Sequence, residues 1–162
     1  MEQYLVLGSI LVIPALFTVF LRTNASLLFF VVAGAFLLKF YLDTDITRIA
    51  GSFIPGDGPA FATVGLLVVP FLIVAFAFKG TVRKSSMLFH ILTAVLTGGT
   101  LVYVSQAFVT PGIAGRMQSY PLWSQIEPFN ALVIATAFLF SVLILWLATP
   151  KEHSGKHKKH HK

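Results

Sequence analysis

Five long apolar runs, one of them interrupted by Lys39, constrain this sequence more than any other feature. A helix needs roughly 20 mostly apolar residues, within a range of about 17–25, to cross the hydrocarbon core of a bilayer. Each run is continuous and does not alternate with polar residues, which favours helices over the strands of a membrane barrel. The predicted spans cover residues 4–21, 25–42, 60–78, 87–109 and 129–148. The sequence therefore predicts an all-α, polytopic helical membrane protein with about five transmembrane helices.

Composition agrees with this prediction. The 162 residues are 56% hydrophobic and only 11% charged, and their mean hydropathy is +0.83. A soluble domain usually carries about 25% charged residues, so this chain has too few charges for a water-facing surface. We expect residues 1–149 to form one transmembrane bundle and residues 150–162 to form a disordered, basic tail rich in Lys and His.

The basic residues predict the orientation, because cytoplasmic loops carry an excess of Lys and Arg. With the tail inside, the cytoplasmic side holds Arg22, Lys79, Arg83, Lys84 and the five Lys of the tail. The opposite side holds Lys39, Arg48 and Arg116. This distribution predicts an N-out, C-in protein of the cytoplasmic (plasma or inner) membrane. Aromatic residues favour the two interfaces, and those expected there are Tyr4, Tyr41, Tyr120, Trp123 and Trp146.

The connections between spans differ in length. Residues 22–24 are so few that the first two spans are expected to form a tight antiparallel hairpin. Residues 43–59 are predicted to be a longer outer loop. Within it, the apolar residues of 45–53 recur at the spacing of one helix face, which predicts a short, separate helix on the outer surface.

The fourth span carries small and polar residues along one stripe. Small residues let helix backbones approach each other, and Thr hydroxyls can hydrogen-bond across such a contact. The stripe is interpreted as a packing face, with the lining of a pore or substrate path as the alternative. Its members are Thr93, Ala94, Thr97, Gly98 and Thr100. His90, near the end of the same span, is expected to be solvated.

Lys39 is the one charged residue inside a predicted span. An intramembrane charge is a candidate functional group. It lies about one helical turn from the end of its span, so its long side chain can also reach the interface. Asp43 follows four residues later and can pair with it. The sequence favours this structural interpretation.

The tail combines five Lys with four His: Lys151, Lys156, Lys158, Lys159 and Lys162, and His153, His157, His160 and His161. Attraction to anionic lipid is the favoured interpretation, at about 1 kcal/mol for each basic residue near the surface. Nucleic acid or ribosome contact is an alternative, since phosphates also attract Lys. Metal binding is a third, but the His spacing is irregular.

No residue pattern predicts catalysis or a cofactor. The chain has no Cys, which excludes thiolate metal sites and a Cys nucleophile. The acids are scattered and do not form the paired carboxylates of an acid–base site. The leading hypothesis is a non-catalytic membrane subunit or scaffold that packs with itself or with other membrane proteins. The alternative is a small oligomeric transporter or channel.

Overall fold

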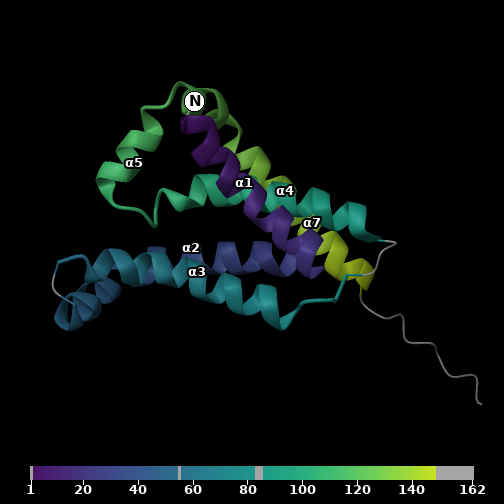
Figure 1. Cartoon of the computed structure of the whole chain (residues 1–162), viewed down its shortest axis with the longest axis horizontal. Helices are drawn as coiled ribbons and strands as arrows, with labels where there is room; N and C mark the ends of the chain where they lie inside the picture. The colour runs from purple at the N-terminus through teal and green to yellow at the C-terminus, as the bar shows by residue number, and fades with distance from the viewer. Residues whose placement is uncertain (1, 55, 83–85, 149–162) are drawn as a thin grey trace, which may run out of the picture.

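The structure is a computed structural model that describes residues 2–54, 56–82 and 86–148. Seven α-helices and one 3-10 helix follow each other in this part of the chain (Figure 1). They are α1 (Glu2–Leu21), α2 (Ala25–Phe53), α3 (Gly58–Ala77), α4 (Met87–Ser105), α5 (Pro111–Gln118), α6 (Pro121–Ile126), η2 (Glu127–Phe129) and α7 (Asn130–Ala148). The predicted basic tail, residues 150–162, lies outside the described residues.

Four helical segments are long and apolar enough to cross a membrane: α2, α3, α4 and the segment Pro121–Leu147 that contains α7. The N-terminal helix contributes a shorter apolar stretch, Leu5–Leu21. The all-α prediction is therefore confirmed, and four of the expected spans are matched by helices of sufficient length. The molecule is a small helical membrane protein.

The separate surface helix predicted at 45–53 is wrong, because α2 continues without a break to Phe53. Hydropathy falls at Asp43, but the charged residues beyond it support the helix instead of ending it. Lys39 pairs with Asp43 at i,i+4, and Arg48 pairs with Asp45 at i,i+3, and such pairs stabilise a helix. The connection between α2 and α3 is therefore much shorter than the predicted outer loop 43–59, because α2 ends at Phe53 and α3 begins at Gly58. The helix α4 ends at Ser105, before the predicted limit of the fourth span at 109.

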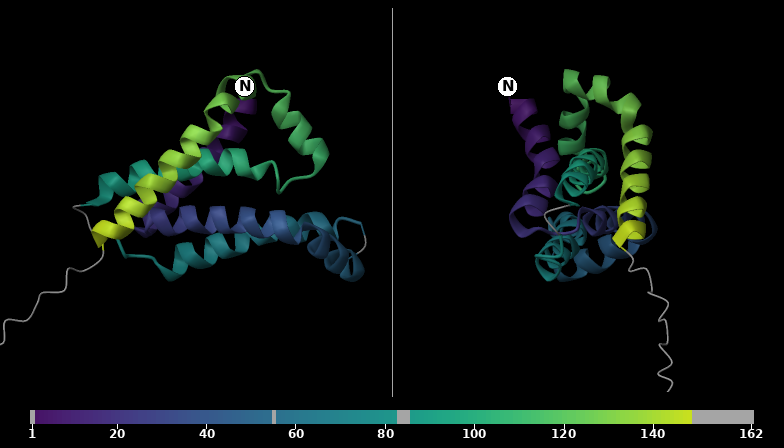
Figure 2. Two further views of the ribbon diagram at one scale, coloured as in Figure 1. Left: turned by 180° about the vertical axis from the view of Figure 1, so that it is seen from behind. Right: turned by 90° about the vertical axis from the view of Figure 1, so that its right-hand side faces the viewer.

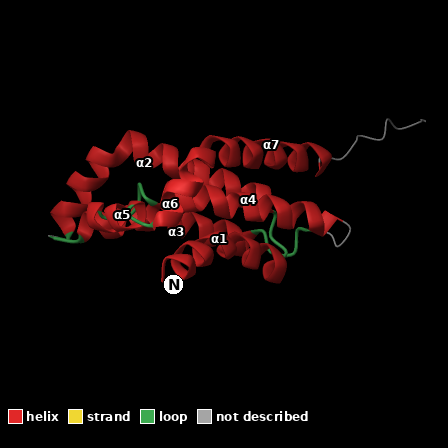
Figure 3. Cartoon of the chain, turned by 90° about the horizontal axis from the view of Figure 1, so that it is seen from above, coloured by secondary structure: helices red, strands yellow, loops and turns green. Residues whose placement is uncertain are grey.

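The helix α4 is central. It packs against α1, α2 and α7, while α2 also packs against α3 and α7. Seen from above and from the side, α1 and α7 lie on opposite sides of α4 (Figures 2 and 3). The predicted hairpin of the first two spans is wrong in its packing: the connection is short, but α1 crosses α2 at an angle and lies mainly along α4 (Figure 1).

The connections at one end of the bundle are held together by hydrogen bonds. The Asn24 side chain accepts a hydrogen bond from the backbone N–H of Ser26 at 3.0 Å and so caps α2. The buried Thr23 hydroxyl donates to the Ala75 carbonyl of α3 at 2.8 Å. The Gly80 N–H donates to the Leu21 carbonyl at 2.7 Å. This end also carries Arg22 and Lys79, and we call it the basic end.

Two apolar clusters form the core. The larger joins residues of α2, α3 and α4, including Leu28, Val32 and Phe71. The smaller lies at the end opposite the basic end and consists of Leu7, Val102, Met117 and Trp123. Trp123 belongs to this second cluster: α5 and α6 fold back beside α1 and α4, which leaves Trp123 only 5% exposed. Trp146, by contrast, is 72% exposed.

Candidate functional site

The stripe predicted on the fourth span lies inside the bundle. Helix α4 packs against α1, α2 and α7, and the stripe residues are all buried: Thr93, Ala94, Thr97, Gly98 and Thr100. The stripe is therefore not exposed on the surface of the single chain.

Gly98 lies against the backbone of α1. A Cβ atom built on Gly98 would be 1.9 Å from the carbonyl oxygen of Leu11 and 2.7 Å from its carbonyl carbon. Only a residue without a side chain allows the two helices to approach this closely. Gly99 is less tightly enclosed, because its Cβ would meet a side-chain atom, Cγ1 of Val133, at 2.9 Å.

The three Thr hydroxyls of the stripe bond within their own helix. Each donates to the carbonyl four residues earlier: Thr93 to Phe89 at 2.9 Å, Thr97 to Thr93 at 2.8 Å and Thr100 to Leu96 at 3.0 Å. This back-bonding satisfies the hydroxyl without a partner helix. Each hydroxyl thus has its donor already used, which weakens the interpretation of the stripe as a polar lining.

Lys39 lies at the side of α2, where it forms an ion pair with Asp43. The Lys39 side chain is 17% exposed and the Asp43 side chain 55% exposed, so the charge is directed towards the more open end of the helix. This geometry fits a long side chain that covers apolar surface with its methylene groups and carries its charge towards water.

A set of buried polar groups lies near the basic end. His90 is 6% exposed, so the expectation that it is solvated is wrong: its side chain lies on the packed face of α4, although Leu88 and Phe89 of the same turn are exposed. Thr18, Ser26 and Ser141 are fully buried. Within the described part of the chain, the three hydroxyls and the His90 Nδ1 atom have no hydrogen-bond partner. Unpaired buried polar groups are costly, and in native proteins strain, a catalytic role, or a bound water or ion accounts for them.

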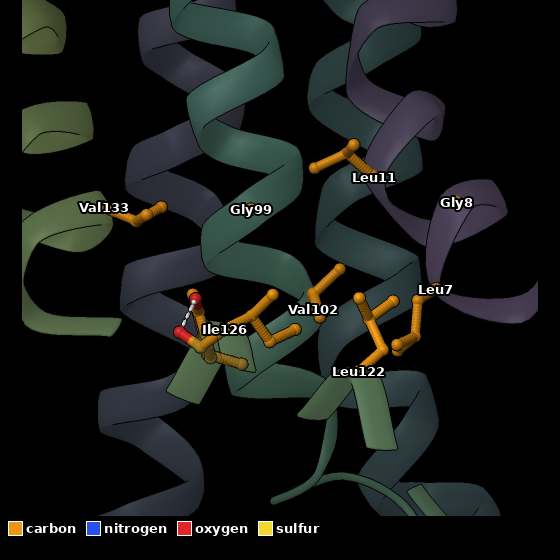
Figure 4. Close-up of a pocket in the computed structure, with 9 residues that line it drawn as sticks. Leu7, Gly8, Leu11, Gly99, Val102, Leu122, Ile126 and Val133 are labelled. Atoms are coloured by element: carbon orange, nitrogen blue, oxygen red, sulfur yellow. Dashed lines mark hydrogen bonds between the residues drawn. The ribbon is translucent and has the colours of Figure 1, made fainter. Parts of the chain in front are cut away.

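An apolar pocket lies in the other half of the bundle, among α1, α4, α6 and α7 (Figure 4). Its volume is about 350 Å³, at the lower end of the usual range for ligand pockets. The lining residues are Leu7, Gly8, Leu11, Gly99, Val102, Tyr103, Leu122, Ile126 and Val133. The Tyr103 hydroxyl donates to the Ile126 carbonyl at 2.7 Å and so fastens the end of α6 to α4.

Sequence reasoning missed this pocket. The available signal was a pair of glycines, Gly8 and Gly99, in two apolar runs. A Cβ atom at Gly8 would meet no atom within 4 Å, so this glycine borders open space. Nothing in the sequence indicates that the two glycines face the same space, because that depends on how α1 crosses α4.

The described residues offer no metal centre: nowhere in them do three or more His, Asp or Glu side chains gather closely enough to hold an ion. The His residues of the tail lie outside this part of the chain. Comparison with protein-family models, curated proteins and solved structures finds no match to this chain.

Proposed function

We propose that this chain is a non-catalytic integral membrane subunit that assembles with copies of itself or with other membrane proteins. The observation that carries the proposal is the way α4 uses its polar residues. Its Thr hydroxyls bond within the helix and its Gly98 packs on α1. A path for a polar solute would use the hydroxyl donors as well as their lone pairs, and here every donor bonds within the helix, so packing explains the stripe better than transport.

The outward face of α3 supports assembly. Gly65 lies on this helix, and a Cβ atom there would meet no atom within 4 Å. Its neighbours on the same face, Phe61, Val68 and Val69, are exposed. A glycine among larger side chains leaves a notch where a second transmembrane helix can approach closely. We therefore assign the face of α3 around Gly65 as the contact with the partner.

The test is purification in mild detergent, with the mass of the particle measured and any co-purifying protein identified. The chain has no Cys, so a single Gly65→Cys variant reports proximity in the membrane without background. We expect it to form a disulfide-linked dimer when the chain self-assembles. The matched control is Leu139→Cys on α7, which is 65% exposed and should remain uncrosslinked. A monomeric particle without a partner and without cross-linking at Gly65 would contradict the proposal.

The second candidate is a small oligomeric transporter or channel. The buried, unpartnered groups at the basic end favour it, since polar groups inside a membrane bundle often mark a solute or ion path. The test is solute and ion flux into vesicles that contain the purified protein, compared with a His90→Ala variant. Flux that the variant abolishes would favour this candidate.

The orientation and the tail belong to the same proposal. We place the N-terminus outside and the basic end on the cytoplasmic side of a plasma or inner membrane, following the excess of Lys and Arg. On that side the five Lys of residues 151–162 would lie near anionic headgroups.

A further inference from the structure

We propose that the pocket between α1, α4, α6 and α7 binds one acyl chain of a bilayer lipid. This inference is independent of the proposed assembly, because none of the residues around the Gly65 notch lines the pocket.

The chemistry of the walls selects a hydrocarbon. Eight of the nine lining residues are aliphatic or Gly, and the ninth is Tyr103. The Tyr103 hydroxyl already donates to the Ile126 carbonyl. A ligand with a polar group in the pocket would leave that group without a partner, which costs free energy in an apolar environment. A hydrocarbon chain has no such group.

The position of the pocket in the membrane indicates which molecule can occupy it. Gly99 and Val102 belong to α4, and Val133 belongs to α7. Both helices lie in segments apolar enough to cross a membrane. The medium that meets the pocket is therefore the hydrocarbon core of the bilayer, whose main component is lipid acyl chain.

The size of the pocket argues against a partner helix as its occupant. One turn of an α-helix is about 5.4 Å long and, with side chains, about 10–12 Å across. Such a turn exceeds the pocket volume of about 350 Å³, and α6 closes the space at Leu122 and Ile126 (Figure 4). A flexible chain a single methylene wide fits a short pocket of this kind.

The fluorescence of Trp123 can report whether an acyl chain occupies the pocket. Its ring packs edge-on against Tyr103, with centroids 5.7 Å apart, so it lies next to the pocket while remaining 5% exposed. A Trp146→Phe background removes the exposed indole at the other end of the bundle. The full-length protein is placed in phosphatidylcholine vesicles whose acyl chains carry bromine, which quenches Trp fluorescence on contact. We expect quenching of Trp123, because the pocket brings a chain close to a buried ring.

A variant whose side chain fills the pocket tests whether the quenching comes from an acyl chain bound there. Gly8→Phe places a large side chain in open space, and we expect it to remove most of the quenching. The matched control is Gly34→Phe on α2, where a Cβ atom also meets nothing within 4 Å but which does not line the pocket. It should leave the quenching unchanged. If Gly8→Phe does not fold, Gly8→Leu makes the same comparison with a smaller group.

Three results would overturn the proposal. The first is no quenching of Trp123 by brominated chains. The second is equal quenching in the Gly8 variant and in its parent. The third is quenching by a brominated sterol but not by brominated acyl chains, which would assign the pocket to a rigid ring system.

Discussion

The contact between α4 and α1 yields the sharpest prediction. A Gly98→Ala variant adds one Cβ atom that would lie 1.9 Å from the Leu11 carbonyl oxygen. An ordinary contact is at least 3.4 Å, so the helices must separate locally by about 1.5 Å. Because both sides of this contact are backbone, no rotamer change can relieve it. We expect destabilisation at the upper end of the range for overpacking, about 3 kcal/mol.

Two other glycines complete a graded series. Gly99→Ala meets a side-chain methyl group of Val133 at 2.9 Å, which can move, so a cost of about 1 kcal/mol is expected. Gly34→Ala, on α2 and away from the proposed contact face of α3, meets nothing within 4 Å. Since Ala is a better helix former than Gly, this variant should be as stable as the parent or more stable.

The assay is unfolding of the purified protein in mixed micelles by increasing dodecyl sulfate, followed by circular dichroism. A loss of about 3 kcal/mol corresponds to roughly a hundredfold change in the unfolding equilibrium constant, which such a titration resolves. The expected order of stability is Gly34→Ala, then Gly99→Ala, then Gly98→Ala. A Gly98→Ala protein as stable as Gly34→Ala would refute the close approach of α1 and α4.

Three further predictions test other parts of the molecule. Single Cys residues at Asp57 and Ser154 should react with impermeant reagents from opposite sides of the membrane; reaction from one side would contradict the proposed topology. Tyr103→Phe removes the donor to the Ile126 carbonyl and should cost about 1 kcal/mol in the same unfolding titration, whereas an unchanged titration would mean that this bond does not hold α6. Removal of residues 151–162 should abolish salt-sensitive attraction to anionic vesicles; binding that persists or ignores salt would exclude the electrostatic interpretation.

Hydropathy predicts the helices of this chain well because the energetics of a span depend on composition alone. It fails where another interaction decides the outcome. The helix α2 continues past Asp43, where local ion pairs support it. A hydropathy scale treats each residue separately and does not include such pairs. A charged residue marks the end of an apolar run, which need not be the end of the helix.

Burial of single side chains could not be predicted in the same way. Trp123 and His90 look interfacial from their position in the sequence, yet both are buried. Trp123 is covered because α6 folds back onto α1 and α4, and His90 is covered because it lies on the same packed face of α4 as Thr93, Ala94 and Thr97. Both results depend on the crossing of helices distant in sequence. The pocket also depends on how these helices cross, so the sequence indicates it only through two glycines, Gly8 and Gly99.

The close contact at Gly98 and the pocket are physically linked, and this gives a last prediction. Leu11 touches Gly98 with its backbone and also lines the pocket. A Cβ atom at position 98 that pushes α1 away from α4 must therefore widen the pocket between these two helices. In the Trp146→Phe background, Gly98→Ala should increase the quenching of Trp123 by brominated acyl chains, while Gly34→Ala should leave it unchanged. A destabilised Gly98→Ala protein with unchanged quenching would show that the contact holds the helices together without shaping the pocket.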